Sequence, residues 1–306
     1  MPVSPQWPDA SRHALVSMRA LLPELRPSER RIAELFLADP AGAAELSVND
    51  VAVRCDTSTT SVIRFCRSHG YGHFRDLRMD VLREITRESI ETAGLPEASG
   101  DIDKDDTLAD IVAKISLAET MSIADTAKTL DSTALQQAVD AISGARRVDV
   151  FGVGASSFVG LDLQQKLTRI GRTVLNWSST HSAWTSAATL NNGTVALAIS
   201  HSGTTSDTVM FLEMAHDSGA TTIALTNHAR SALAAHADIV LTTAARETGF
   251  RSGALGSRIA QLMVVDCLFI GVAQSDYEQS MNAIRRTYAA THRLSDPRAI
   301  RPFDDT

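Results

Sequence analysis

Two short segments of the chain combine hydroxyl side chains with glycine, and each stands at the end of an apolar run. Residues 200–205 read S-H-S-G-T-T after the run 194–199, and residues 152–157 read G-V-G-A-S-S at the end of the run 148–152. Hydroxyl groups and the free N–H groups of a following helix bind phosphate, and glycine lets the backbone approach it closely. We therefore predict that both segments form one site for a phosphorylated ligand.

The expected phosphate contacts are the hydroxyls of Ser156, Ser200, Ser202 and Thr205. Glu247, on the loop after the fifth predicted strand, is included because that loop could bring it into the same site. The full set of predicted ligand-binding residues is Gly154, Ser156, Ser157, Ser200, His201, Ser202, Gly203, Thr205 and Glu247. The alternative interpretation is that both segments only cap helices and bind no ligand.

The pair Gly152 and Gly154 also matches the start of a dinucleotide-binding fingerprint. Two features oppose that interpretation. Ser157 replaces the third glycine, and the next predicted strand ends in W-S-S at residues 177–179, without an acid to bind a ribose hydroxyl. We expect no nicotinamide dinucleotide and no other cofactor.

An enzyme that acts on a bound sugar needs a general base near it. The loop residues that could accept a proton are His181, His201, His228 and Glu247. Glu247 could be a base or could bind a sugar hydroxyl, but no second acid or base is spaced to pair with it. We predict no catalytic residue and favour binding without turnover.

The three cysteines, Cys55, Cys66 and Cys267, are widely spaced and form no C-x-x-C pair. Two belong to predicted N-terminal helices and the third to an apolar helix, so they are poor candidates for a nucleophile. A scattered, odd set is typical of a reducing cytoplasm and argues against a metal site.

A further group of residues combines hydroxyls with arginine. Residues 58–61 read S-T-T-S and open a predicted helix that carries Arg64 and Arg67, after a short helix over 48–54. Two helices joined by a turn of three or four residues form a helix-turn-helix pattern. The apolar residues expected to pack both helices against a helix over 29–38 are Val51, Ala52, Val62, Ile63 and Phe65.

This packing directs the hydroxyls and Arg64 outward. Small hydroxyl residues at a helix start suit phosphate and base-edge contacts, and Arg64 can form two hydrogen bonds with guanine. Arg67 and Arg75 are expected to bind backbone phosphates. The predicted DNA-binding residues are Ser58, Thr59, Thr60, Ser61, Arg64, Arg67 and Arg75. A helical bundle that serves only for dimerisation is the alternative.

The surrounding pattern predicts a helical domain over 12–90. The expected N-caps are Ser28, Ser47 and Ser58. The Asp39-Pro40 pair ends the helix that begins at residue 29, Gly70 ends the helix that carries Arg64, and a last helix covers 74–88. A linker rich in Gly, Pro and acidic residues follows at 91–107.

The second domain is predicted at 108–290, with a tail at 291–306. A helix over 108–129 leads into runs rich in β-branched residues that alternate with helices. The expected strands are 148–152, 173–176, 194–199, 221–226 and 238–242, followed by a helix over 252–274. This alternation predicts an α/β fold with a five-stranded parallel sheet flanked by helices.

The net charge of the 306 residues is −7, but it is unevenly distributed. Residues 1–90 hold 12 Arg, no Lys and 12 Asp or Glu, so the whole excess of acid lies in residues 91–306. The N-terminus shows no signal-peptide pattern, and the apolar run 260–273 is too short to cross a bilayer. We therefore expect a cytoplasmic protein that does not associate with a membrane.

The N-terminal motifs resemble those of RpiR/MurR-type bacterial transcription regulators. The resemblance rests on S-E-R-R-I-A at 28–33, S-V-I-R-F-C-R at 61–67, Gly70-Tyr71 and F-R-D-L at 74–77. This chain departs from that group in the turn, where Cys55-Asp56 stands in place of the usual Ala-Gly. Asp tolerates a left-handed backbone better than most residues, so we expect the turn to be retained.

The glycine and serine segments resemble the sugar isomerase (SIS) domain, which binds phosphosugars. G-x-G-x-S matches at 152–156 and S-x-S-G-x-T at 200–205, while D-L-Q-Q-K-L at 162–167 and S-R-I-A-Q-L at 257–262 resemble the regulator branch. The resemblance implies a sugar-phosphate-responsive regulator that binds double-stranded DNA. A symmetric homodimer or homotetramer would bind an inverted repeat. The alternative is an SIS-fold phosphosugar isomerase or lyase with a helical appendage.

Overall fold

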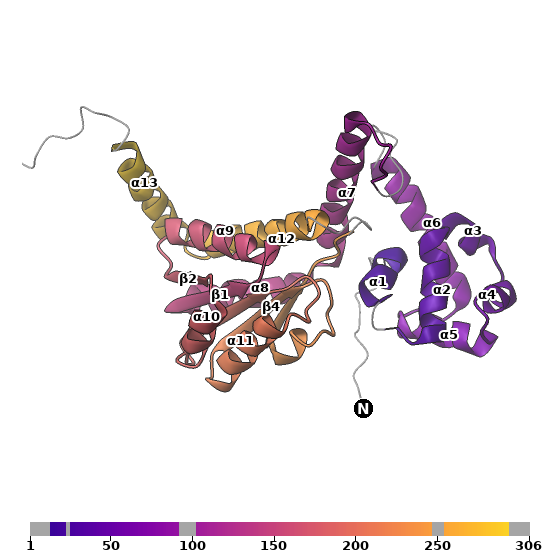
Figure 1. Ribbon diagram of the computed structural model, residues 1–306, viewed down its shortest axis with the longest axis horizontal. Coiled ribbons are helices and arrows are strands. Elements are labelled where there is room, and N and C mark those ends of the chain that lie inside the picture. Colours follow the sequence, from indigo (N-terminus) through magenta and orange to yellow (C-terminus); the bar gives the residue numbers. More distant parts are fainter. Residues whose placement is uncertain (1–12, 23–24, 92–101, 247–253, 294–306) are drawn as a thin grey trace, which may run out of the picture. The chain divides into compact units, whose positions relative to one another are not determined.

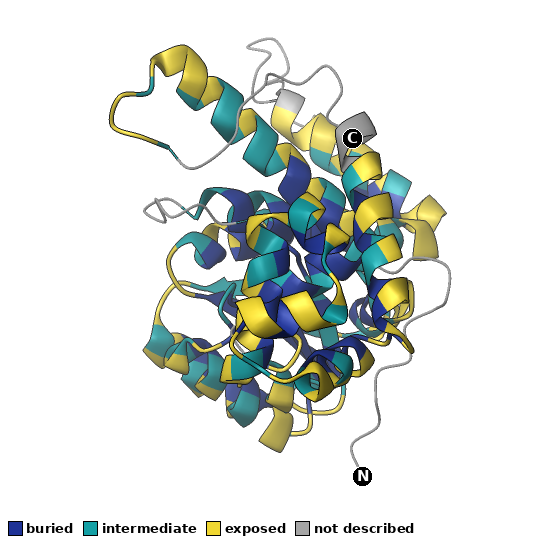
Figure 2. Ribbon diagram, turned by 90° about the vertical axis from the view of Figure 1, so that its right-hand side faces the viewer, coloured by how far each residue is buried: buried dark blue, intermediate teal, exposed yellow. Residues whose placement is uncertain are grey.

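The computed structural model describes residues 13–22, 25–91, 102–246 and 254–293 (Figure 1). The chain divides into two compact units. One comprises residues 1–130, 227–230 and 242–260, and the other comprises 131–226, 231–241 and 261–306. Figure 2 shows buried residues on the inward sides of the helices and exposed residues on their outward sides, as expected for amphipathic helices.

The N-terminal region is helical, as predicted. Its helices are α1 (Ala14–Leu21), α2 (Pro27–Ala38), α3 (Pro40–Glu45), α4 (Val48–Arg54), α5 (Thr59–Ser68) and α6 (Phe74–Glu91). The prediction that Ser28 caps α2 is wrong, because α2 begins at Pro27 and its N-cap is Arg26. Proline suits the first position of a helix because its φ is already helical and it has no N–H group that needs a partner.

The other predicted caps are confirmed. The Ser47 side chain accepts a hydrogen bond from the Asp50 N–H, and the Asp50 carboxylate accepts one from the Ser47 N–H, which completes a capping box. The Ser58 side chain accepts from the Ser61 N–H at the start of α5. Gly70 follows α5 with a φ of +82°, the left-handed conformation that ends a helix most easily at glycine.

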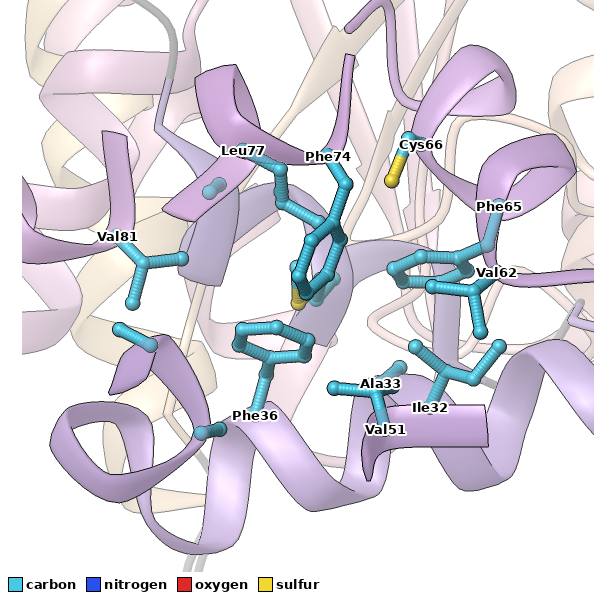
Figure 3. Packing of buried hydrophobic residues seen from close by; sticks show 14 of the residues in the cluster. Ile32, Ala33, Phe36, Val51, Val62, Phe65, Cys66, Phe74, Leu77 and Val81 are labelled. Atoms are coloured by element: carbon cyan, nitrogen blue, oxygen red, sulfur yellow. The ribbon is translucent and has the colours of Figure 1, made fainter. Parts of the chain in front are cut away.

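A single hydrophobic core holds these helices together (Figure 3). Val51 of α4 and both Val62 and Phe65 of α5 are fully buried and lie beside Ile32 and Phe36 of α2. Ala52 is also buried and Ile63 is partly buried against the same core, so the predicted packing of the helix-turn-helix pattern is confirmed.

The chain continues through α7 (Leu108–Thr129), whose bounds match the prediction, and α8 (Ser132–Gly144), which the sequence analysis did not predict. A capping box between Thr107 and Asp110 starts α7, and the Asp131 side chain caps α8.

The remaining chain forms a five-stranded sheet with strand order β2-β1-β3-β4-β5. The strands are β1 (Arg147–Gly152), β2 (Val174–Trp177), β3 (Thr194–Ile199), β4 (Thr221–Thr226) and β5 (Ile239–Thr242). Strand β1 pairs in parallel with β2 and β3, and β3 pairs in parallel with β4. The predicted α/β fold with a parallel sheet is therefore confirmed. No strand end differs from its predicted position by more than one residue.

Helices cover both faces of the sheet. The further helices of this region are α9 (Ala155–Arg169), α10 (Thr180–Ala187), α11 (Ser206–Asp217), α12 (Leu255–Ser275) and α13 (Tyr277–Arg293), with a short 3-10 helix at Ala234–His236. In Figure 1, α9 and α12 lie on one side of the sheet and α10 and α11 on the other. Phe151 of β1 contacts Phe211 of α11, with ring centroids 5.4 Å apart, in the core on the α10–α11 side.

The late apolar helix is observed as α12, Leu255–Ser275, close to the expected bounds of 252–274, and it extends beyond the apolar run 260–273. Helix α12 has 21 residues, and it is the one described helix that is long and apolar enough to cross a membrane by length and composition alone. Its side chains pack within the sheet domain, because Val264, Val265 and Leu268 are fully buried. The core helix of a protein without membrane spans passes the same test of composition.

Glu84 of α6 is a buried carboxyl group that joins α6 to the start of α1. It accepts hydrogen bonds from the N–H groups of Leu15 at 2.9 Å and Val16 at 3.3 Å. Burial raises the pKa of Glu84 to about 7, although the two hydrogen bonds oppose this shift. The folded protein therefore keeps the Glu84 proton at a higher pH than the unfolded chain does.

We predict that Glu84→Gln flattens the pH dependence of unfolding between about pH 5 and pH 7. In the wild type, the free energy of unfolding should fall as the pH rises through this range, because only the unfolded chain releases the proton easily. Chemical unfolding at pH values from about 5 to 8 measures both slopes. Glu34→Gln, at an exposed position of α2, should keep the wild-type slope. An unchanged slope for Glu84→Gln would contradict the prediction.

Candidate functional site

The two glycine and hydroxyl segments start side by side at one edge of the sheet. Strands β1 and β3 are parallel neighbours, and Gly152 at the end of β1 lies opposite Ile199 at the end of β3. The chain order reverses between these two strands, because β2 lies beyond β1 and β4 lies beyond β3. Open α/β sheets bind ligands at such a reversal, outside the carboxyl ends of the strands.

The segment after β1 turns sharply into α9. Gly154 is the N-cap of α9 and has a φ of +63°, which favours glycine. A Cβ atom on Gly152 would lie 3.0 Å from the Ile199 carbonyl oxygen and 3.0 Å from the Ser156 Cβ, so the backbones are too close for a side chain. Ser156 is buried, and the Ser157 hydroxyl donates to the Gly154 carbonyl at 2.7 Å.

The segment after β3 is held by its own hydroxyl groups. The Ser200 hydroxyl accepts a hydrogen bond from the Gly203 N–H at 3.1 Å and shares one with the Thr205 hydroxyl at 3.1 Å. The Ser202 hydroxyl accepts from the N–H and the hydroxyl of Thr204. Gly203 has a φ of +63°, and a Cβ there would lie 2.1 Å from the Ser231 hydroxyl, so only glycine fits.

Helices α9 and α11 both begin without a side-chain cap. Neither Gly154 nor Thr205, their N-caps, makes a side-chain cap hydrogen bond, whereas the Ser179 side chain caps α10 in the same domain. The first N–H groups of a helix have no partner within the helix and carry a partial positive charge. Side chains therefore do not cap these two helix ends, and the edge of the sheet presents two helix N-termini of the kind that suits an anion.

Neighbouring elements fix this edge through residues that the sequence analysis missed. The Thr180 hydroxyl at the start of α10 donates to the Asp207 carboxylate of α11 at 3.0 Å, and the Trp184 indole N–H donates to the Asp207 carbonyl at 3.0 Å. The Thr226 hydroxyl at the end of β4 donates to the His201 carbonyl at 3.2 Å. These residues could have been found from their positions next to the loops in space. That requires knowing the order of the strands in the sheet, which the sequence alone does not give.

The three histidines considered as loop bases differ in how far they are exposed. His181 is exposed, whereas His201 and His228 are half-buried. Glu247, the predicted residue from the loop after β5, lies outside the described residues. Burial raises the pKa of all three cysteine thiols, that of Cys66 to about 12, which disfavours the thiolate form that a nucleophile needs.

Most of the residues predicted to bind DNA are exposed in the helical region. Ser58, Thr59, Thr60, Arg64, Arg67 and Arg75 are exposed, and Ser61 is half-buried. The Arg64 side chain is 52% exposed, and its Nε lies 3.4 Å from Oε1 of the buried Glu29. This ion pair joins the Nε side of the Arg64 guanidinium to α2.

Comparison with known proteins connects each region to a family. A model of the helix-turn-helix domain of the rpiR family matches residues 13–88, and a model of the SIS domain matches residues 141–271. An uncharacterized HTH-type transcriptional regulator of Caldanaerobacter subterraneus subsp. tengcongensis is 38% identical over 273 residues, which cover 89% of this chain and 95% of that protein. The HTH-type regulator YbbH of Bacillus subtilis is 34% identical over 277 residues, covering 90% and 96%.

Solved structures give the same result. The NanR protein of Vibrio vulnificus, complexed with ManNAc-6P, is 26% identical with a TM-score of 0.58, over 92% of this chain and 99% of that one. The sugar isomerase domain of an RpiR transcription factor from Sphaerobacter thermophilus is 26% identical with a TM-score of 0.53, over 58% and 98%. The chain therefore belongs to the RpiR family of HTH-type transcriptional regulators, with a helix-turn-helix domain followed by an SIS domain.

Proposed function

We propose that this regulator binds double-stranded DNA through α5 and binds a phosphorylated sugar at the β1–β3 edge of its SIS domain, in the cytoplasm and without turnover. The observation that carries the proposal is the pair of uncapped helix N-termini, α9 and α11, beside hydroxyl-rich loops. NanR, a structural neighbour with the same two regions, was solved with ManNAc-6P bound. A phosphate is the shared chemical group that such an edge would bind.

The DNA-binding part rests on the outward face of α5. Its first turn carries hydroxyls and its only charged residues are Arg64 and Arg67. The contact with Glu29 orients Arg64, whose two terminal nitrogens can then bind O6 and N7 of one guanine. Arg67 and Arg75 are exposed, which suits contacts to phosphates.

We predict that Arg64→Ala and Arg67→Ala affect DNA binding differently. Loss of Arg64 should lower affinity for the selected site by about 10- to 100-fold and leave affinity for unrelated DNA nearly unchanged, because base contacts carry the discrimination. Loss of Arg67 should weaken both by a similar factor and reduce the salt dependence. Electrophoretic shifts with the protein's own upstream DNA and with random duplex at several salt concentrations measure this.

Arg83→Ala, at an exposed position of α6 outside the predicted face, is the matched control for loss of one positive charge. Equal behaviour of the Arg64 and Arg67 variants would contradict the assigned roles. Failure of the wild type to bind its upstream region or neighbouring sugar-catabolism promoters at low salt would contradict the DNA-binding function.

The ligand would act by linkage between the two domains. A phosphorylated sugar changes DNA occupancy only if it binds one arrangement of the DNA-binding domains more tightly than another. A homodimer or homotetramer that binds an inverted repeat provides such arrangements, because a symmetric protein binds a symmetric site. An SIS-fold isomerase or lyase remains the second candidate, and turnover of the bound phosphosugar would establish it.

We predict that Ser200→Ala and Ser202→Ala weaken phosphosugar binding. Both hydroxyls lie in the loop before α11, and Ser200 also supports the Gly203 N–H. A ligand at about 100 times its Kd should raise the Tm of the wild type by roughly 5 °C or more, and the variants should lose most of this rise. Thermal shift with a panel of phosphosugars that includes ManNAc-6P, and with their unphosphorylated forms, measures it.

Ser132→Ala, at the exposed start of α8, is the matched control and should keep the wild-type shift. The Tm of each variant without ligand separates a loss of binding from a loss of stability. Equal shifts from sugars with and without phosphate would contradict the phosphate site.

A further inference from the structure

The turn between α4 and α5 places a residue other than glycine in a left-handed conformation. Asp56 has a φ of +44°. The Thr57 N–H bonds the Ala52 carbonyl at 2.9 Å and the Asp56 N–H bonds the Val53 carbonyl at 3.2 Å, the pattern that ends many helices and usually has glycine at the left-handed position. After α5 the same pattern recurs with Gly70 at that position.

Arg31 of α2 binds the carbonyl groups of Cys55 and Asp56 in this turn. Its Nε donates to the Cys55 carbonyl at 2.7 Å, and its terminal nitrogen donates to the Asp56 carbonyl at 2.7 Å. The Cys55 thiol lies 3.5 Å from the Arg31 carbonyl, so the two segments also meet through the reverse contact. The next residues of α2, Ile32 and Ala33, are fully buried, which fixes the backbone that carries Arg31.

We propose that Arg31 is a positioning residue that locks the Cys55-Asp56 turn and thereby sets the direction of α5. This proposal rests on the proposed DNA-binding function of α5. Only Thr57 and Ser58 separate Asp56 from the first residue of α5, so a change in the Asp56 backbone redirects the whole helix. The planar fork of arginine fits two adjacent carbonyls, whereas lysine offers a single point of charge.

The structure also explains why this chain needs the contact. A glycine at position 56 would adopt the left-handed conformation without strain, whereas aspartate has to be held there. The two hydrogen bonds from Arg31, on helix α2 of the same core, stabilise this conformation.

The test uses four full-length variants: Arg31→Ala, Arg31→Lys, Arg31→Ala with Asp56→Gly, and Arg83→Ala as the control for charge. DNA probes are a duplex selected by the wild type from a random library and an unselected random duplex. Hydrogen exchange of the peptide over residues 52–61 reports on the turn without DNA, and thermal unfolding reports on overall stability.

We expect Arg31→Ala to lose about tenfold or more in affinity for the selected duplex, with little change for the random duplex, and to exchange faster at the turn. Arg31→Lys should not recover either property, whereas Asp56→Gly in the Arg31→Ala background should recover both. Arg83→Ala should resemble the wild type.

Equal losses on both duplexes without recovery by Asp56→Gly would overturn the proposal and make Arg31 a phosphate contact. Unchanged exchange at residues 52–61 in Arg31→Ala would also overturn it. If the wild type selects no duplex, the DNA-binding function fails, and the exchange measurements still decide whether Arg31 locks the turn.

Discussion

Burial of one face of each helix fixes where its first turn lies, and both candidate sites depend on this constraint. Val62 and Phe65 anchor α5 in the N-terminal core, so the turn that begins at Ser58 is held at the surface. In the SIS domain, the pairing of Gly152 with Ile199 places the starts of α9 and α11 at one edge. Both sites then offer phosphate the same groups, hydroxyls and the N–H groups of a helix start.

The sequence predicted the elements whose signal is local. The Ser58 cap, the Gly70 helix end and the five strands follow from residue type and periodicity within a short window. The hydroxyl loops could also be placed, because parallel strands bring their carboxyl ends to one edge. The departure at Asp56 was predicted to keep the turn, and its φ of +44° confirms this.

Other features depend on contacts between distant residues and could not be predicted. Helix α2 begins at Pro27 and Ser28 does not cap it, although both residue types are acceptable at a helix start, so residue type alone does not decide between them. The Glu29–Arg64 ion pair and the Thr180–Asp207 hydrogen bond join residues 27 or more positions apart, and neither residue type indicates its partner. That α9 and α11 have no side-chain caps could not be predicted either. It becomes clear only when the structure shows that the hydroxyls of their loops bind other partners.

The neutral charge of residues 1–90 does not make their surface neutral, because the acids and the arginines have different uses. Asp39 and Asp50 accept backbone N–H groups at helix starts, Glu84 is buried, and Glu29 pairs with Arg64. Arg67 and Arg75 remain exposed, and α5 contains no acid. Most other arginines of this region are exposed as well, and phosphate contacts from such side chains carry no sequence information by themselves. If α5 binds DNA as proposed, its orientation would therefore matter more than the total charge for which DNA is bound.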